Sequence, residues 1–487
     1  MRHRVIALLM GLCALGMTSC ATNPATGQRQ LSLVSEQQEV AMGKEGDTQV
    51  KQEYGVYQDA ALQAYVSEVG QRMAKLSHRT NLPWTFTVVD SPEINAFALP
   101  GGWIYITRGL MAYLDSEAEL AGVLGHEIGH VTARHGAQQQ TQSTIGQVLS
   151  VGAEILGQVL GGVQGAGQIV GGIAGSMIQQ HGHDHELEAD KLGAEYISRV
   201  GFDARQMIKV IGVLKAQEVY AEDRARAQGR PPQRMPEYGS THPSNEQRLQ
   251  EINAIASRYP PAAGDTGRER YLARINNLTF GDSREQGVIR GNNFYHEPLA
   301  ITLNAPAGWR FQNTPDKLVA MNANQTAAVA MLPAGTGGTH EEIIRKAFNP
   351  ARGQVDRINI NGDPATYFIG VAVNEQRQQV PIEAVVLTHA NTNYLFQIVA
   401  KEAPPQGTGR AEARELIRSF HTMTPQERAA AQPQRLRTYV VRSGETYASL
   451  ARGAGDPQSL ESRLRLLNGQ YPAGELSAGR SIKVLAQ

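Results

Sequence analysis

The sequence of 487 residues predicts a multidomain protein of the α+β class. Three observations support this prediction. Hydrophobic patterns typical of helices and of strands both occur between residues 36 and 260. Pro260, Pro261 and Gly264 indicate a linker, so we expect a mainly helical first domain with a small β-sheet at residues 35–265. Separate patterns of strands and helices follow at residues 270–425 and 436–487.

The N-terminus has the pattern of an export signal. A basic start, Arg2 to Arg4, precedes an apolar stretch, Val5 to Met17, that is too short to remain as a membrane span. We therefore expect residues 1–20 to be a signal peptide. Small residues before Cys20 resemble a bacterial lipoprotein signal, which implies a lipidated Cys20 and, because Ala21 follows it, a periplasmic protein anchored to the outer membrane. An ordinary cleaved secretory signal is the alternative.

The cysteine count and the charge balance narrow the class of protein. Cys13 lies in the predicted signal and Cys20 is expected to carry lipid, so the mature chain has no disulfide. The 46 basic and 46 acidic side chains cancel, so no net charge favours nucleic acid as a partner. Residues 21–34 are predicted to form a tether.

Local patterns then predict the first elements of the domain in order. Apolar residues at helical spacing predict helices within residues 36–79. Strands are expected at residues 85–89, 95–99 and 103–107, the last two flanking the turn residues Pro100, Gly101 and Gly102.

The strongest signal is the motif His126-Glu127-Ile128-Gly129-His130. Ser116 and Glu119 form a capping box that predicts the start of a helix here, and Gly136 predicts its end. Because a helix repeats every 3.6 residues, His126 and His130 project from one face and can bind one metal ion. Glu127 lies close enough to act as general base on a water held by that ion. The motif predicts a zinc site that hydrolyses amide bonds.

A second predicted helix supplies the third ligand. Glu186 and Asp190 are four residues apart, so both can face the two histidines from a neighbouring helix. Glu186 completes a set of two histidines and one glutamate for one Zn²⁺, and Asp190 can accept the free ring N–H of a ligating histidine. Glu188 is expected to point away. The alternative is that these three acidic residues form a solvated face.

Two segments between these helices allow more than one interpretation. Residues 145–178 are rich in glycine and aliphatic residues, with Glu154 as the only charge. We expect a glycine-rich helical hairpin or plug over the site, and the alternative is a transmembrane hairpin. The run from His181 to His185 is expected to be a solvated polar loop, and the alternative is a second metal site.

Four phrases in this order resemble the HtpX/BepA-type branch of the CAAX-prenyl-protease superfamily of zinc metallopeptidases. They are Asn95 to Gly102, Glu119 to Val131, His185 to Asp190 and Ser240 to Pro243. The resemblance covers residues 30–260 and implies a gluzincin domain in which His126, His130 and Glu186 bind zinc and Glu127 is the general base. It also implies that His242 lies over the metal, where it stabilises the oxyanion or, in a resting state, obstructs the site.

The predicted strand at residues 95–99 suggests how a substrate binds. A strand beside a zinc site can bind an extended polypeptide by main-chain hydrogen bonds, which selects unfolded or looped chains more than a particular sequence. We therefore predict substrate contacts from Asn95, Ala96, Phe97 and Ala98.

The C-terminal half contains two further predicted domains. Residues 270–425 carry strand and helix patterns without a catalytic cluster, and the phrase from Leu303 to Trp309 resembles PsbP-like α/β sandwiches. We expect a partner-binding or spacer domain there. Residues 436–487 resemble a LysM module, a βααβ unit. That resemblance implies peptidoglycan as a ligand, and a small cap for protein contacts is the alternative.

The sequence thus predicts a zinc endopeptidase of the bacterial cell envelope that degrades misfolded or stalled proteins, including outer-membrane proteins or parts of their assembly machinery. A latent or non-catalytic, chaperone-like lipoprotein that binds envelope proteins or peptidoglycan is the alternative. Because no zinc ligand or base lies in residues 436–487, we expect proteolysis to survive deletion of this segment.

Overall fold

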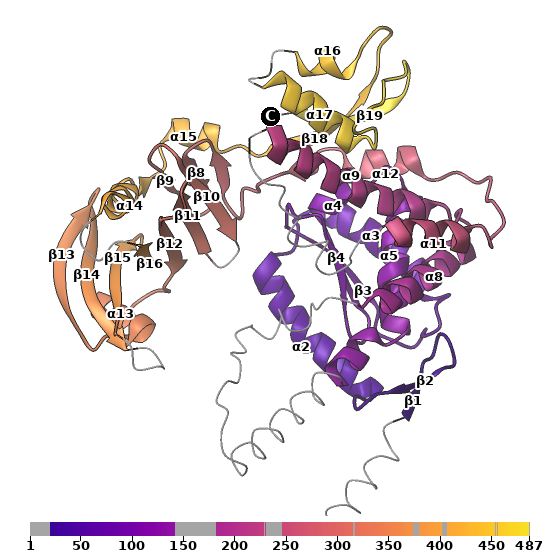
Figure 1. The fold of residues 1–487 in the computed structure, drawn as a ribbon, viewed down its shortest axis with the longest axis horizontal. Coiled ribbons are helices and arrows are strands. Elements are labelled where there is room, and N and C mark those ends of the chain that lie inside the picture. Colours follow the sequence, from indigo (N-terminus) through magenta and orange to yellow (C-terminus); the bar gives the residue numbers. More distant parts are fainter. Residues whose placement is uncertain are drawn as a thin grey trace, which may run out of the picture. The chain divides into compact units, whose positions relative to one another are not determined.

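A computed structural model describes residues 20–141, 182–227, 229, 246–314, 317–373, 379–401, 407–452, 454 and 456–486. The chain divides into two compact units: unit 1 (Met1–Phe280 and Arg435–Ala486) and unit 2 (Gly281–Gln434). Helices and sheets occur in both units (Figure 1), so the prediction of a multidomain α+β protein is confirmed.

Unit 1 contains the small sheet that the sequence predicts. One face of the sheet enters the main core through Ile104 and Ile106, and the opposite face carries Tyr105, whose hydroxyl donates to Asp47 of helix α2 (Glu36–Tyr54) at 2.7 Å. The strand order is β3 (Thr85–Val89), β5 (Trp103–Thr107) and β4 (Ala96–Leu99), with β3 parallel and β4 antiparallel to β5. Strand β4 is therefore an edge strand.

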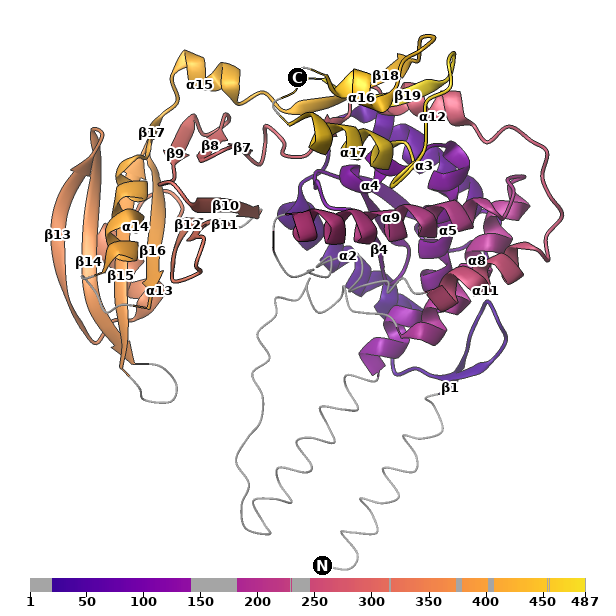
Figure 2. The same ribbon diagram turned by 45° about the horizontal axis from the view of Figure 1, so that its top comes forward.

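Helix α5 (Glu117–Thr132), which carries the His126–His130 motif, forms the centre of unit 1. Every residue of α5 is buried, because helices and strand β4 pack around it (Figure 2). The surrounding helices include α3 (Ala60–Ala74), α8 (His183–Arg199), α9 (Gln206–Ala227) and α12 (Arg268–Ile275).

Small residues let α5 and α8 approach closely. A Cβ atom on Gly129 would lie 2.9 Å from the carbonyl oxygen of Ala189, and a Cβ atom on Gly193 would lie 3.0 Å from the backbone nitrogen of His126. Larger side chains at these positions would separate the helices. The glycine inside the motif therefore allows the two predicted ligand helices to touch.

The end of α5 differs from the prediction. Ser116 caps the N-terminus, since its Oγ accepts from the backbone N–H of Glu119 at 3.2 Å. The Glu119 carboxylate accepts from the backbone N–H of Asp115 at 2.7 Å rather than from that of Ser116, so the predicted capping box is half formed. The helix ends at Thr132 instead of near Gly136, because Arg134 has a left-handed backbone with φ 64°. In this conformation the Arg134 guanidinium donates to the buried carboxylate of Glu39 in α2, a tertiary contact that a local pattern does not reveal.

Residues 20–31 form a hairpin rather than the predicted tether. Strands β1 (Cys20–Thr22) and β2 (Arg29–Leu31) pair antiparallel. In the turn, Asn23 Oδ1 accepts from the backbone N–H groups of Ala25 at 2.9 Å and Thr26 at 3.2 Å. Such a turn is a local property of asparagine. Asn23 is only 4% exposed, so the hairpin is fixed against unit 1.

The C-terminal segment also belongs to unit 1. Its elements follow the predicted order of strand, helix, helix and strand: β18 (Gln434–Val440), α16 (Tyr447–Ala451), α17 (Pro457–Leu467) and β19 (Ser481–Ala486). Strand β18 lies between β19 and β6 (Thr279–Phe280) in one sheet, so unit 1 continues past the boundary predicted at residue 265.

This segment packs next to the N-terminus of α5. Leu436, Tyr447 and Leu467 lie in the same hydrophobic core as α5. The buried Lys483 donates to the carbonyl oxygen of Leu114 at 2.7 Å, two residues before the Ser116 cap. Removal of residues 436–487 would uncover the core around α5, so this packing argues against the expectation that proteolysis survives their deletion.

We expect deletion of residues 435–486 to abolish the cooperative unfolding transition of unit 1. As a milder test, Leu467→Ala should cost about 2–5 kcal/mol, the usual range for removing a buried leucine side chain. Urea unfolding followed by tryptophan fluorescence measures both effects. A truncated protein with the stability of the intact chain would contradict this packing.

Unit 2 is a layered α+β structure. A seven-stranded antiparallel sheet has the order β10-β11-β12-β16-β15-β14-β13. Successive residues of β15 point to opposite faces: Val386 packs with Ile344 of helix α13 (His340–Phe348), and Val385 packs with Leu416 of helix α14 (Thr408–Arg418). The two helices therefore cover opposite faces of the sheet.

The sequence pattern predicts strands at residues 299–303, 327–331, 365–373, 382–388 and 393–399, and each overlaps a strand of unit 2. These are β9 (Ile301–Asn304), β12 (Ala327–Pro333), β14 (Asp363–Val373), β15 (Gln379–His389) and β16 (Thr392–Ala400). Strands that the sequence pattern did not identify are β7 (Val288–Arg290), β8 (Asn293–His296), β10 (Trp309–Thr314), β11 (Lys317–Asn322), β13 (Arg352–Ile360) and β17 (His421–Thr422).

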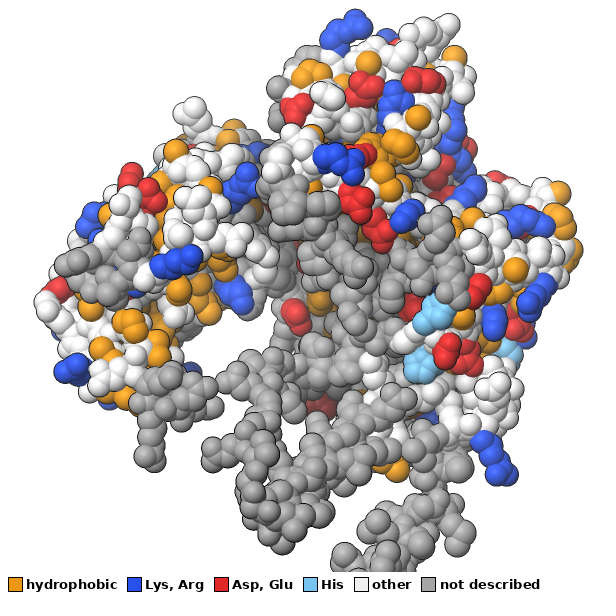
Figure 3. Space-filling model, viewed as in Figure 1, with side chains coloured by type: hydrophobic (Ala, Val, Ile, Leu, Met, Phe, Trp, Pro, Cys, Tyr) orange, Lys and Arg blue, Asp and Glu red, His pale blue; other side chains and the backbone are white. Residues whose placement is uncertain are grey.

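Several predicted features fall outside the described residues. They are residues 1–19 of the signal peptide, the glycine-rich segment at residues 145–178, His181 and His242. Within the described ranges, no helix combines the length and the apolar character needed to cross a membrane. On the face drawn in Figure 3, acidic and basic side chains are interspersed over both units.

Candidate active site

Three buried side chains from two helices converge in unit 1. His126 and His130 come from α5, and Glu186 comes from the first turn of α8. The Nε2 atoms of the two histidines are 3.0 Å apart, and the Glu186 carboxylate oxygens lie 3.5 Å from Nε2 of His126 and 3.3 Å from Nε2 of His130. Ligands about 2.0 Å from a tetrahedral zinc ion are about 3.3 Å from one another, so these residues fit zinc.

His126 is oriented by a buried carboxylate, as predicted. Its Nδ1 lies 2.9 Å from Oδ1 of Asp190, which leaves Nε2 facing the other ligands. Burial alone would raise the pKa of Asp190. The charge and hydrogen bonds of Arg248 outweigh this effect and lower the pKa to about 2. Asp190 is therefore a carboxylate at neutral pH and accepts the Nδ1–H of His126.

Arg248 is a site residue that the sequence analysis missed. It lies in α11 (Glu246–Ala256), is 2% exposed, and donates from Nε and Nη2 to the two Asp190 oxygens at 2.7 and 2.8 Å. Its Nη1 lies 2.8 Å from the Glu186 carboxylate. One signal was available: Arg248 takes a core-facing position four residues before the buried Ile252.

Replacing Arg248 should destabilise the site strongly. Arg248→Met leaves two buried carboxylates without their cation, and breaking a buried ion pair costs about 3–5 kcal/mol. Urea unfolding of the metal-free protein measures this cost. Arg248→Lys keeps the charge but loses the planar, forked set of N–H donors, so its loss of stability should be intermediate. An Arg248→Met protein as stable as the wild type would refute the assigned pairing.

The second histidine ligand has a different partner. Nδ1 of His130 lies 2.8 Å from Nδ1 of His135, a fully buried residue beyond the end of α5. Nε2 of His135 lies 3.0 Å from Oε2 of Glu188. Burial raises the pKa of Glu188, but the hydrogen bond and charge of His135 lower it below its usual range. The expectation that Glu188 points away from the site is wrong, because His135 links Glu188 to the ligand His130.

The histidine run at the start of α8 is helical rather than the predicted loop. Helix α8 begins at His183, and the ring of His185 stacks on His135 with centroids 4.2 Å apart. Among the described residues, His126, His130 and Glu186 form the one cluster with metal-binding geometry. His181 lies outside the described residues, and so does part of the alternative metal site.

The remaining predicted residues lie on α5 and on or next to strand β4. Glu127 is 1% exposed on α5. Asn95 precedes β4, and Ala96 and Phe97 are buried within it. Ala98 and His130 line the same small cavity.

Comparison with known proteins agrees with this geometry. The profile of Peptidase family M48 matches residues 60–256. The beta-barrel assembly-enhancing protease of Escherichia coli is 29% identical over 296 residues, which cover 58% of this chain and 58% of the relative. The mitochondrial metalloendopeptidase OMA1 of Schizosaccharomyces pombe is 28% identical over 255 residues, which cover 50% of this chain and 69% of the relative. The chain thus spans 58% of the length of the Escherichia coli relative.

The cyanobacterial PsbP protein of Synechocystis aligns with 29% of this chain and 98% of its own length, at 11% identity and a TM-score of 0.22.

The matched residues 60–256 contain all three convergent ligands, the glutamate of the motif and the buried partners Asp190 and Arg248. The profile match and the ligand geometry fall on the same residues, so residues 60–256 are similar to Peptidase family M48 in both sequence and arrangement of metal-binding side chains.

Proposed function

We propose that this chain is a zinc-dependent endopeptidase of the bacterial cell envelope that cleaves misfolded or stalled polypeptides. The observation that carries the proposal is the convergence of His126, His130 and Glu186 within a domain that matches family M48. Zinc bound there supplies a Lewis acid and a water of lowered pKa.

The chain's own residues divide the remaining work. Glu127, one position from His126 on α5, is assigned to take the proton of the attacking water and to deliver it to the leaving amine. Asp190 holds the tautomer of His126 by accepting its Nδ1–H. We assign His242 to the oxyanion, or to a resting state that obstructs the site, on the basis of the family resemblance alone.

The edge strand β4 is the proposed substrate strand. It pairs with β5 along one side, and its other side is an edge of the sheet. An extended polypeptide can add to such an edge by main-chain hydrogen bonds. Among the described residues, Oδ1 of Asn95 is buried without a hydrogen-bond partner. Asn95 is therefore a candidate to accept an N–H from substrate at one end of the strand, while Ala98 lies beside His130.

The envelope location rests on the N-terminus and on the relatives. We propose lipidation of Cys20 and anchoring to the outer membrane. One relative is named a beta-barrel assembly-enhancing protease, which favours outer-membrane proteins, or parts of their assembly machinery, as partners. We further propose that unit 2 is a partner-binding or spacer domain of PsbP-like type, and that the C-terminal βααβ segment is a LysM-like module that binds peptidoglycan.

Fractionation and a degradation assay test this function together. The wild-type protein should fractionate with the outer membrane and degrade an unfolded outer-membrane protein faster than the same protein folded in detergent. Cys20→Ser should release it to the soluble fraction without loss of proteolysis. Chelator-insensitive binding of the unfolded protein, without cleavage, would favour the chaperone-like alternative instead.

The glycan proposal needs a test that leaves the C-terminal segment in place. We expect the full chain to sediment with purified peptidoglycan and to be released by soluble N-acetylglucosamine oligomers. Sedimentation that these oligomers do not reduce would contradict a LysM-type interaction.

A further inference from the structure

The two histidine ligands are oriented by different devices. His126 contacts the carboxylate of Asp190 directly, whereas His130 meets the ring of His135, and His135 in turn meets Glu188. This series of side-chain contacts continues to the N-terminal hairpin, because Oε1 of Glu188 lies 3.0 Å from the side-chain amide of Asn23. This second chain of contacts reaches a segment more than a hundred residues away in sequence.

Each member of the chain has one role if His130 binds metal. A lone pair on Nε2 requires the proton of His130 to be on Nδ1, so Nδ1–H donates to Nδ1 of His135. His135 then carries its own proton on Nε2 and donates it to Glu188. Stacking on His185 restricts the plane of the His135 ring. The direction of every hydrogen bond follows from the ligation of a single histidine.

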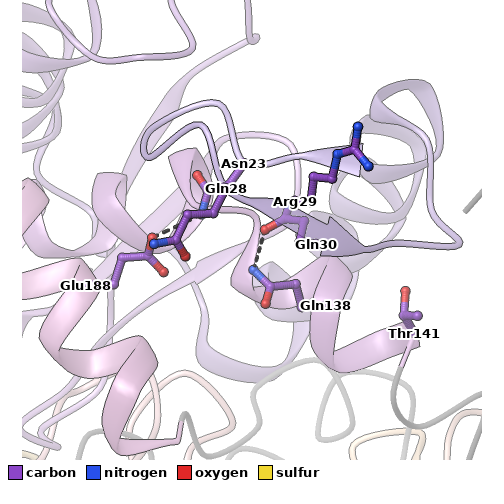
Figure 4. A pocket seen from close by; sticks show the side chains of 7 residues that line it. All are labelled: Asn23, Gln28, Arg29, Gln30, Gln138, Thr141 and Glu188. Atoms are coloured by element: carbon purple, nitrogen blue, oxygen red, sulfur yellow. Dashed lines mark hydrogen bonds between the residues drawn. The ribbon is translucent and has the colours of Figure 1, made fainter. Parts of the chain in front are cut away.

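Asn23 completes the chain with a fixed orientation. Its Oδ1 is used in the hairpin turn by the N–H groups of Ala25 and Thr26, so the amide NH₂ is the group that faces Glu188. Figure 4 shows Asn23 and Glu188 pointing toward one another at a polar pocket that Gln30, Gln138 and Thr141 also line. The far end of the chain is thus built by the residues that directly follow Cys20.

We propose that His135, Glu188 and Asn23 are positioning residues that hold His130 in its metal-binding tautomer and couple the N-terminal hairpin to zinc affinity. This inference rests on the zinc centre of the proposed function and adds a part to it. Partners of metal-ligating histidines commonly change metal affinity about 10- to 100-fold when they are replaced. The hairpin after the anchoring residue is therefore part of the metal site.

Zinc affinity, measured by competition with a fluorescent chelator, tests the chain without using peptidase activity. His135→Phe keeps a flat ring for stacking but removes the acceptor, so affinity should fall about 10- to 100-fold. His135→Asn restores an acceptor near the Nδ1 position and should recover part of this loss. Glu188→Ala should weaken zinc binding in the same direction.

A substitution at Asn23 can separate its contact with Glu188 from its role in the hairpin turn. Asn23→Asp keeps the oxygen that forms the turn but faces Glu188 with a like charge, so it should lower zinc affinity while the hairpin remains. Asp184→Asn is the matched control, since it removes one charge from an exposed position one turn before Glu188 and should leave affinity unchanged. Circular dichroism of the metal-free variants verifies the fold.

The outcomes distinguish a failure of the proposed His130–His135–Glu188–Asn23 contacts from a failure of the zinc site itself. Wild-type affinity in folded His135→Phe and Glu188→Ala would overturn the proposal, as would equal losses in His135→Phe and His135→Asn. If His135→Phe fails to fold, Asn23→Asp decides the question alone. A wild-type protein that binds no zinc would instead refute the proposed function.

Discussion

Glu127→Gln should retain about one zinc ion per chain and lose peptidase activity. Glutamine has the size and hydrogen-bonding capacity of glutamate but cannot take a proton from water at neutral pH. General-base contributions are about 10²- to 10⁴-fold, so kcat/KM should fall by at least this much. Zinc content by elemental mass spectrometry and cleavage of an unfolded substrate measure the two effects separately.

The combination of outcomes is what identifies the role. Loss of zinc in Glu127→Gln would make Glu127 a structural part of the site rather than a base. Full activity of a zinc-loaded Glu127→Gln protein on a substrate that the wild type cleaves would refute the hydrolytic mechanism.

Replacing any one ligand should remove zinc and lower stability at the same time. His126→Ala, His130→Ala and Glu186→Ala each leave two donors, and binding to the folded state is linked to folding. At a free zinc concentration 100-fold above the dissociation constant, the wild type gains about 2.7 kcal/mol that a variant without zinc does not. Thermal unfolding with and without added zinc measures the difference.

Glu195→Ala is the control for these variants, because Glu195 lies on α8 but pairs with Arg199 at the surface. It should keep both zinc and the zinc-dependent stabilisation. A Glu186→Ala protein that binds zinc like Glu195→Ala would show that the third ligand is assigned wrongly. Glu188 is unsuitable as this control, because its contact with His135 ties it to the site.

The parts of the site that could be predicted are those with a local period. His126 and His130 are one turn apart, and so are Glu186 and Asp190, so the geometry of a helix places each pair on one face. Gly129 and Gly193 then let the two helices touch, which brings the pairs together. These elements need no information about distant residues.

The parts that could not be predicted depend on tertiary contacts. Arg248, Asn23 and His135 join the site from separate segments, and their spacing has no helical or strand period. Glu188 was misjudged because the helical wheel gives its direction but not what lies there. Arg248 could have been suspected as a cation at a core-facing position of an amphipathic helix.

Tertiary contacts also explain why the packing of the C-terminal segment could not be predicted. Its strand, helix, helix, strand order is what the LysM resemblance implies, but the pairing of β18 with β6 and the contact of Lys483 with Leu114 join residues far apart in sequence. In unit 2, β13 is exposed along almost its whole length, so it lacks the alternating pattern by which strands are recognised.

The central claim is that this site is a zinc peptidase centre, and one metal-dependence experiment tests it most directly. The intact protein is incubated with an unfolded substrate before chelation, after removal of metal, and after return of one equivalent of zinc, and new N-termini are identified by mass spectrometry. We predict cleavage, loss of cleavage and recovery, in that order. Cleavage that continues unchanged after metal has been removed would contradict the claim.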